Sequence, residues 1–185
     1  MIEIRIHGRG GQGNVVAAYL LAMAAFEEGR HGQAFPNFGA ERRGAPVMAF
    51  VRINDEPILQ RNQVTAPDYL IVQDQALLHV PGVLSGLMPN GKILVNSSLS
   101  SEEASTEFNR EITTIPAGAL AKEILGRPVP NTALLAAFFA LTGILSQASL
   151  QKVLQQKFKG PTLDKNLSLI IKAAELVSAN QWKEA

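Results

Sequence analysis

The feature that most constrains the fold is a cluster of glycines that begins seven residues into the chain. Gly8, Gly10 and Gly13 match the pattern G-x-G-x-x-G. Before them, Ile2–His7 alternates apolar and polar residues as a strand does, and after them Asn14–Glu28 has helical composition. A strand, a glycine loop and a helix in that order form the opening unit of an α/β fold.

The rest of the chain extends this pattern. We predict further strands at Met48–Ile53, Tyr69–Gln73, Lys92–Val95 and Glu111–Ile115, and short helical segments near Gln75–Leu78 and Val83–Leu87. We predict C-terminal helices at Ala119–Leu125, Thr132–Leu145, Leu150–Phe158 and Leu163–Ala179. The sequence therefore predicts a single α/β domain over residues 1–185, with a Rossmann-like open sheet and a helical C-terminal third.

Composition excludes several functions. The chain has no cysteine, so it cannot ligate an iron–sulfur cluster or use a thiol, and its three histidines form no metal-binding pattern. A net charge of +1 and 6% aromatic residues do not suggest a nucleic-acid surface. Only 18% of residues are charged, which favours a surface partly covered by partners. The most apolar stretch, Leu134–Leu145, is too short to span a bilayer, and we predict a cytoplasmic protein.

Two interpretations of the glycine loop remain open from the residues alone. Glycines there allow the backbone to approach an anion at a helix N-terminus, or they serve only tight packing of strand and helix. We expect Asn14 to be the N-cap of that helix. A dinucleotide site also needs an acidic residue at the end of the second strand, whereas the next extended piece, Gln33–Phe38, contains none, so NAD is disfavoured.

A second segment, Gln33–Pro46, contains two prolines and two glycines, and we predict an ordered loop. It carries Glu41, Arg42 and Arg43. An arginine pair of this kind grips a phosphate or carboxylate, or locks the loop to a neighbouring subunit. An internal Glu–Arg salt bridge on a surface turn is the simpler alternative.

Two other positions have simpler roles. His7, at the end of the first strand, is best interpreted as a packed histidine rather than a ligand. Asp74 and Gln75 follow a predicted central strand, where α/β ligand crevices form, but no second acid or base is spaced with them. We therefore predict no catalytic residue.

The motifs together resemble a known family. HGRGGQG near the start, followed by QAFPNFGAERRGAPVMAFVRI, is similar to the gamma subunit of pyruvate and related 2-oxoacid:ferredoxin oxidoreductases. The strand at Pro67–Val72, the segment Ile115–Ala117 and Asn131 before an apolar helix also agree, so the resemblance covers nearly the whole chain. Many relatives carry two glycines after the arginine, whereas Gly44-Ala45-Pro46 here resembles the pyruvate-type branch.

The resemblance implies a division of labour. Enzymes of this family decarboxylate a 2-oxoacid, pass electrons to ferredoxin and release an acyl-CoA. The resemblance places thiamine diphosphate and Mg in alpha and beta subunits, and [4Fe–4S] clusters in a delta subunit, with no cofactor in this chain. It makes coenzyme A the natural anionic ligand of the gamma subunit.

The candidate site residues follow from that resemblance. Their expected role is contact with coenzyme A, and they are Gly8, Gly10, Gly11, Gln12, Gly13, Asn14, Arg42 and Arg43. An equal possibility is that the arginine loop anchors this subunit to the alpha subunit. Two alternative functions belong to other classes. One is a free-standing Rossmann-type nucleotide-binding protein, and the other is an interaction scaffold whose glycine loop binds nothing.

Overall fold

The computed structural model describes residues 1–37 and 44–183. A six-stranded mixed sheet has the order β2-β3-β1-β4-β5-β6. The strands are β1 Ile2–Arg9, β2 His31–Pro36, β3 Pro46–Asn54, β4 Tyr69–Val72, β5 Lys92–Asn96 and β6 Ile112–Ile115. β1, β4, β5 and β6 are parallel, whereas β3 runs antiparallel to both β1 and β2.

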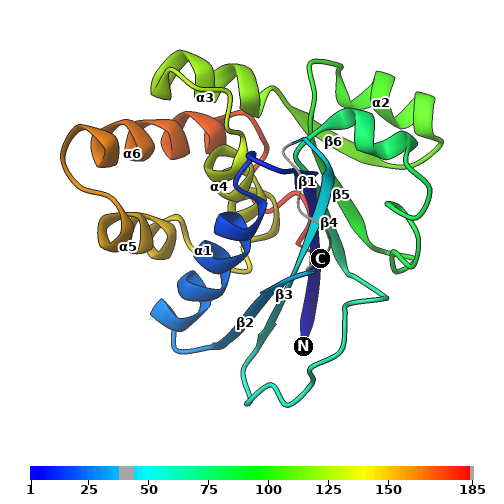
Figure 1. The fold of residues 1–185 in the computed structure, drawn as a ribbon, viewed down its shortest axis with the longest axis horizontal. Helices are drawn as coiled ribbons and strands as arrows, with labels where there is room; N and C mark the ends of the chain where they lie inside the picture. The colour runs from blue at the N-terminus through cyan, green and yellow to red at the C-terminus, as the bar shows by residue number, and fades with distance from the viewer. Residues whose placement is uncertain (38–43, 184–185) are drawn as a thin grey trace.

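Helices cover both faces of this sheet (Figure 1). The helices are α1 Asn14–Glu27, the 3-10 helix η1 Gln75–His79, α2 Ser101–Phe108, α3 Ala117–Leu125, α4 Asn131–Thr142, α5 Gln147–Lys157 and α6 Gly160–Glu175. α1 and α3 to α6 lie on one face, and α2 lies on the other. The predicted α/β fold, with an open sheet and a helical C-terminal third, is confirmed.

The larger core lies under α4. Ile4 and Ile6 point from β1 towards this side and pack in the same cluster as the apolar residues of α1 and α4. Eleven of the twelve residues of α4 are buried, which explains why its sequence is apolar on every side. On the opposite face, Leu70, Val72 and Ile93 pack against η1 and α2.

Three local predictions were wrong. His31–Pro36, predicted in part as loop, is strand β2, which is defined by its pairing with β3 rather than by alternation of its own residues. Val83–Leu87 forms turns rather than a helix, because Gly82 and Gly86 adopt positive φ angles of 91° and 75°. Helix α2 was not predicted, since SEEASTEF has few apolar residues.

The chain path brings the two sequence motifs together. β1 and β2 both run antiparallel to β3, so they end at the same edge of the sheet. The described ends of the connection from β2 to β3, Asn37 and Gly44–Ala45, therefore lie at the end of β1, where Pro46 pairs with Arg9. The glycine loop and these described residues of the second motif share one edge as a result.

Candidate functional site

The glycine loop begins later than the sequence suggested. Gly8 and Arg9 still belong to β1, and the loop comprises residues 10–13. The Gly10 amide donates to Ala45 O at 3.0 Å, and the Gly44 amide donates to Gly10 O at 3.2 Å. These two bonds fix the loop against the second motif, whose Arg42 and Arg43 lie outside the described residues.

Two glycines of the loop need positive φ angles. Gly11 has φ 98° and Gly13 has φ 77°, values at which a side chain is strained. Gly13, not Asn14 as predicted, is the N-cap of α1, and no side chain caps this helix. The first amides of a helix have no partner within it, so the uncapped α1 favours an anion at this point.

Asn14 instead points back into the sheet, which is why it cannot act as the cap. It is 3% exposed, and its Nδ2 donates to Ile6 O at 3.0 Å and to Val47 O at 3.3 Å. Its Oδ1 accepts a hydrogen bond from Gln73 Nε2 at 3.1 Å. The Asn14 side chain therefore joins β1, β3 and the residue after β4 beneath the glycine loop and is not itself open to a ligand.

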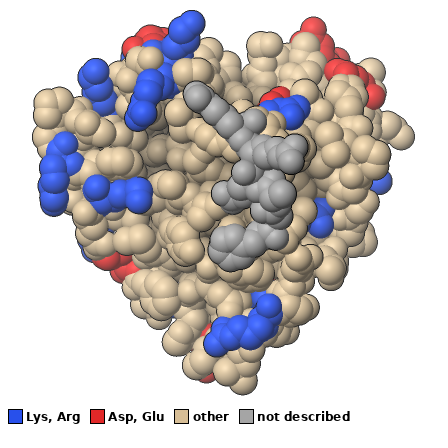
Figure 2. All heavy atoms as spheres, viewed as in Figure 1, with Lys and Arg blue, Asp and Glu red and all other residues tan. Residues whose placement is uncertain are grey.

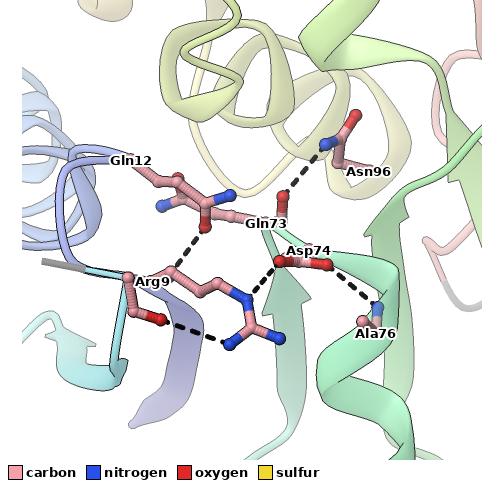
Figure 3. A network of polar contacts seen from close by, with 7 residues as sticks. Arg9, Gln12, Gln73, Asp74, Ala76 and Asn96 are labelled. Carbon is pink, nitrogen blue, oxygen red and sulfur yellow. Dashed lines mark hydrogen bonds and ion pairs between the residues drawn. The ribbon is translucent and has the colours of Figure 1, made fainter.

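An ion pair forms the other side of the loop (Figure 3). Arg9 Nε lies 2.5 Å from Asp74 Oδ2, and Arg9 also donates to Gly44 O at 3.2 Å. Gln12 Oε1 accepts from the Arg9 amide at 2.7 Å, while Asp74 Oδ1 accepts from the Ala76 amide at 3.0 Å. Arg9 is thus a cation held at the glycine loop, and sequence analysis missed it although it stands between Gly8 and Gly10.

The start of α4 also contacts the loop. Asn131 Nδ2 donates to Gly13 O at 3.3 Å, across 118 residues of chain. Asn131 is 7% exposed, and its Oδ1 accepts from the Thr132 amide. Asn131, at the start of the apolar helix α4, therefore has a structural role: its side chain supports the turn from which α1 begins.

A polar crevice of about 290 Å³ opens beside the loop. Gln12, Gln73 and Asp74 line one side of it, and Asn96, Ser97 and Gly118 line the other. These residues end or follow β1, β4 and β5 or begin α3, so the crevice lies at the carboxyl ends of parallel strands. Ligands of open α/β sheets bind at such an edge.

A larger hollow of about 1110 Å³ lies at the opposite ends of the same strands. Tyr69, Lys92 and Trp182 line it, and no residue predicted for the site takes part. Because that edge is not where open α/β sheets bind their ligands, the smaller crevice and the glycine loop form the candidate site.

His7 is packed, as its sequence context favoured. It is 4% exposed, and its Nε2 accepts a hydrogen bond from Arg5 Nε at 2.9 Å. Burial, followed by the Arg5 charge, lowers the pKa of His7 to about 3. A neutral histidine with its acceptor nitrogen occupied supports the sheet and is not positioned as a proton donor.

Surface charge is uneven on the face that carries α1. Lysines and arginines gather over the helical side, at the left of the view (Figure 2). Tyr19, Met23 and Phe26 of α1 are 49%, 38% and 59% exposed, at spacings that place them on one side of the helix. Exposed apolar residues grouped in this way are typical of surfaces that other proteins cover.

Within residues 1–37 and 44–183, no three acidic, histidine or cysteine side chains are grouped so as to hold a metal. None of the described helices combines the length and hydropathy needed to cross a membrane.

Comparison with known proteins identifies the family. The model of the family described as pyruvate ferredoxin/flavodoxin oxidoreductase matches residues 3–176. The pyruvate synthase subunit PorC of Methanothermobacter marburgensis is 54% identical over 166 residues, which are 90% of this chain and 92% of that protein. The pyruvate/ketoisovalerate oxidoreductases common subunit gamma of Thermococcus kodakarensis is 46% identical over 95% of this chain and 94% of its own.

A solved structure agrees with both. The crystal structure of pyruvate oxidoreductase subunit PORC from Thermotoga maritima superimposes with a TM-score of 0.85 at 36% identity, covering 94% of this chain and 95% of that one. The motifs that carried the resemblance fall inside the region matched by the family model. The chain therefore belongs to the pyruvate ferredoxin/flavodoxin oxidoreductase family and is a gamma subunit of a 2-oxoacid:ferredoxin oxidoreductase.

Proposed function

We propose that this subunit binds coenzyme A in a complex that oxidises pyruvate, or forms it in the reverse reaction, with the glycine loop taking a phosphate of coenzyme A. Pyruvate is favoured because relatives from Methanothermobacter marburgensis and Thermotoga maritima carry that substrate in their names. Alpha and beta subunits would hold thiamine diphosphate with Mg, and a delta subunit would hold [4Fe–4S] clusters and pass electrons to ferredoxin.

The observation that carries the proposal is the combination of an uncapped helix and a fixed cation. α1 begins at Gly13 without a side-chain cap, and Arg9 stands beside the same loop, one-third exposed. No hydrogen bond is made by the Gly11 amide to any described residue. An anion placed there would meet the positive end of the helix dipole and a guanidinium group together.

Not every predicted contact remains available. The Gly10 amide is bonded to Ala45 O, and the Gln12 amide is bonded to Arg9 O. Backbone donation to a phosphate would therefore come from Gly11 and from the first turn of α1. Gly8, Gly10, Gln12 and Asn14 would support that geometry, and Arg42 and Arg43 remain predicted contacts.

The chemistry left to this chain is binding and orientation. In the family reaction, thiamine diphosphate held by the partner subunits would supply the decarboxylation chemistry, and the thiol of coenzyme A would be the acyl acceptor. Arg9 and the loop would hold the distant phosphate end, so that the thiol is delivered to the partner subunits as an intramolecular reactant. The exposed apolar side chains of α1 support a subunit contact.

The alternative of a free-standing nucleotide-binding protein is disfavoured by β2. In the dinucleotide-binding arrangement an acid at the end of the second strand accepts from a ribose hydroxyl. β2 has the sequence HGQAFP and is followed by Asn37, so that acceptor is missing.

The proposal is tested on the intact complex by steady-state kinetics in coenzyme A. We expect Arg9→Gln to raise KM for coenzyme A about tenfold at nearly constant kcat, since a uniform binding contact is lost. Arg110→Gln, at the amino end of β6 and away from the loop, is the matched control. The double variant Arg9→Gln/Asp74→Asn separates loss of the cation from repulsion by an unpaired Asp74.

If the double variant has the KM of the unchanged complex, the rise in KM in Arg9→Gln came only from repulsion by the unpaired Asp74 carboxylate. An unchanged KM in Arg9→Gln, with an assembled complex, would show that the glycine loop does not bind coenzyme A. Loss of the complex in Arg9→Gln, but not in Arg110→Gln, would instead assign the loop to subunit assembly.

A further inference from the structure

The side chain of Gln73 is held in one orientation by its neighbours. Two backbone carbonyls, those of Ile6 and Val47, accept from Asn14 Nδ2, so Asn14 Oδ1 must face Gln73. Gln73 Nε2 donates to that oxygen at 3.1 Å. Reversing the Gln73 amide would place two acceptors against each other, so its Oε1 is forced away from Asn14.

This leaves a buried acceptor with nothing to accept. Gln73 is 0% exposed, and its Oε1 has no hydrogen-bond partner among the described residues. The backbone of Gln73 is also fixed, because its amide donates to His7 O and its carbonyl accepts from Asn96 Nδ2. Native proteins rarely leave a buried acceptor unpaired unless a ligand or water completes it.

The position of Gln73 favours a ligand. It lines the crevice of about 290 Å³, and Gln12, whose side chain lies beside it in Figure 3, lines the same crevice. In the part of the chain that the structure describes, two other buried side-chain atoms lack partners, Gln147 Oε1 and Trp182 Nε1, and neither residue lines this crevice. Gln73 thus combines an unpaired acceptor with the edge of the sheet where ligands bind.

Several other acceptors of the crevice are already paired. Asn96 Oδ1 accepts from the Gly118 amide, Asp74 accepts from Arg9 and Ala76, and Ser97 Oγ donates to Gln75 Oε1. A group that binds Gln73 Oε1 must offer it an N–H or O–H, because this atom can only accept. A phosphate, which has mainly acceptor oxygens and a negative charge, does not fit an acceptor beside the Asp74 carboxylate.

We propose that this crevice is a second subsite of the coenzyme A site, which receives an N–H or O–H donor of the uncharged pantetheine arm on Gln73 Oε1. The inference rests on the proposed function, in which the glycine loop takes a phosphate. Loop and crevice adjoin at Gln12, so one extended ligand can occupy both. Gln73 is then a specificity-determining residue for the arm rather than for the nucleotide.

The test compares two ligands on the intact complex. Adenosine 3′,5′-bisphosphate carries the phosphates and adenine of coenzyme A without the arm. We expect Gln73→Met to raise KM for coenzyme A about tenfold, equivalent to about 1.4 kcal/mol, and to leave Ki for the bisphosphate unchanged. Gln147→Met is the matched control, because it also removes a buried unpaired amide oxygen but lies in α5.

Each result is decisive. No change in KM would assign Gln73 Oε1 to water, and an equal change for both ligands would assign it to the nucleotide or to packing; either overturns the subsite. If Arg9→Gln raises KM while Gln73→Met does not, the subsite fails and the proposed function stands. If neither variant changes KM and the bisphosphate does not compete, the proposed function fails as well.

A second measurement avoids dependence on the variant's folding. In the unmodified complex, coenzyme A analogues with an ester in place of either pantetheine amide lose one N–H donor, and an analogue lacking the arm hydroxyl loses the O–H. We expect one of the three to bind about tenfold more weakly than coenzyme A. Equal affinity for all three would overturn the proposal.

Discussion

The side-chain amide of Asn131, at the start of α4, lies against Gly13, the N-cap of α1. Its Nδ2 donates to Gly13 O at 3.3 Å, and a Cβ added to Gly13 would collide with the same amide. Gly13 also has φ 77°. Glycine is therefore favoured at position 13 for two reasons: its positive φ angle and the Asn131 side chain that an added Cβ would meet.

We expect Gly13→Ala to destabilise the chain by about 3 kcal/mol, the sum of left-handed strain and a collision with Asn131. Gly11→Ala is the matched control, because φ is 98° there but no atom lies within 4 Å of an added Cβ. It should cost about 1 kcal/mol. Urea unfolding followed by circular dichroism measures both values.

The double variant Gly13→Ala/Asn131→Ala isolates the collision. Its loss in free energy of unfolding should be smaller than the sum of the losses in the two single variants, because the alanine at position 131 removes the obstructing amide. Equal losses for Gly13→Ala and Gly11→Ala would show that Asn131 does not constrain the loop.

The sequence predicted the elements of the site better than its contacts. Strand, glycine loop and α1 were recognisable because their signals are local: alternation, glycine spacing and helical composition. The edge strand β2 was recognised only in part, as the extended piece Gln33–Phe38, because HGQAFP becomes a strand only through its pairing with β3. α2 did leave a local signal, the capping box of Ser100 and Glu103, which our prediction did not use.

The contacts of the site depend on residues far apart in the chain. Arg9 and Asp74 are 65 residues apart, and they meet because β1 and β4 lie side by side in parallel register. Gln73 reaches Asn14 for the same reason. No local pattern marks such pairs, whereas the general rule that ligand crevices form after central strands did point to Asp74.

The Arg9–Asp74 ion pair should contribute little to stability. The two side chains are 33% and 25% exposed, and ion pairs with such access to water are screened. A double-mutant cycle of Arg9→Gln and Asp74→Asn, measured by urea unfolding, should give a coupling free energy below about 1 kcal/mol. A coupling above about 2 kcal/mol would mean that the pair stabilises the fold rather than positions Arg9.

The Glu3–Arg52 pair should behave differently, because Arg52 is 1% exposed. Arg52 Nε donates to Glu3 Oε1 at 2.7 Å, and its remaining contacts are neutral. Glu3→Leu would leave a buried charge without its counterion and should cost about 3 kcal/mol. The double variant Glu3→Leu/Arg52→Met should recover most of that loss.

The exposed pair Arg30–Asp55 is the control for this comparison, with Asp55 81% exposed. Asp55→Asn should change the free energy of unfolding by less than about 0.5 kcal/mol. If Glu3→Leu lowers the free energy of unfolding no more than Asp55→Asn does, the buried charge of Arg52 does not need the Glu3 carboxylate for stability.

His7 should make stability depend on pH in a defined window. Burial and the Arg5 charge lower its pKa from 6.5 to about 3, so the folded protein keeps it neutral. Between pH 3 and 6.5, His7 binds a proton in the unfolded chain but stays neutral in the folded protein. Stability is therefore full above pH 6.5 and falls by about 1.4 kcal/mol per pH unit below it.

The window from pH 7 to pH 5 separates this effect from that of the acids. The pKa of Glu28, lowered by its hydrogen bonds from Ser146 against the opposing effect of burial, lies below 4.5, so its contribution is lost only in more acidic solution. His7→Gln keeps an acceptor for Arg5 but cannot titrate. From pH 7 to pH 5 the unchanged protein should lose about 2 kcal/mol more than this variant.

Urea unfolding at the two pH values measures that difference, and His79→Gln is the control, because the His79 side chain is 63% exposed. The control should keep the pH dependence of the unchanged protein, since it leaves the buried histidine in place. The same pH dependence in His7→Gln would mean that His7 is protonated in the folded protein and that Arg5 does not donate to it. A flat profile in His7→Gln alone would establish the neutral His7 beside Arg5 as the source of acid sensitivity in this range.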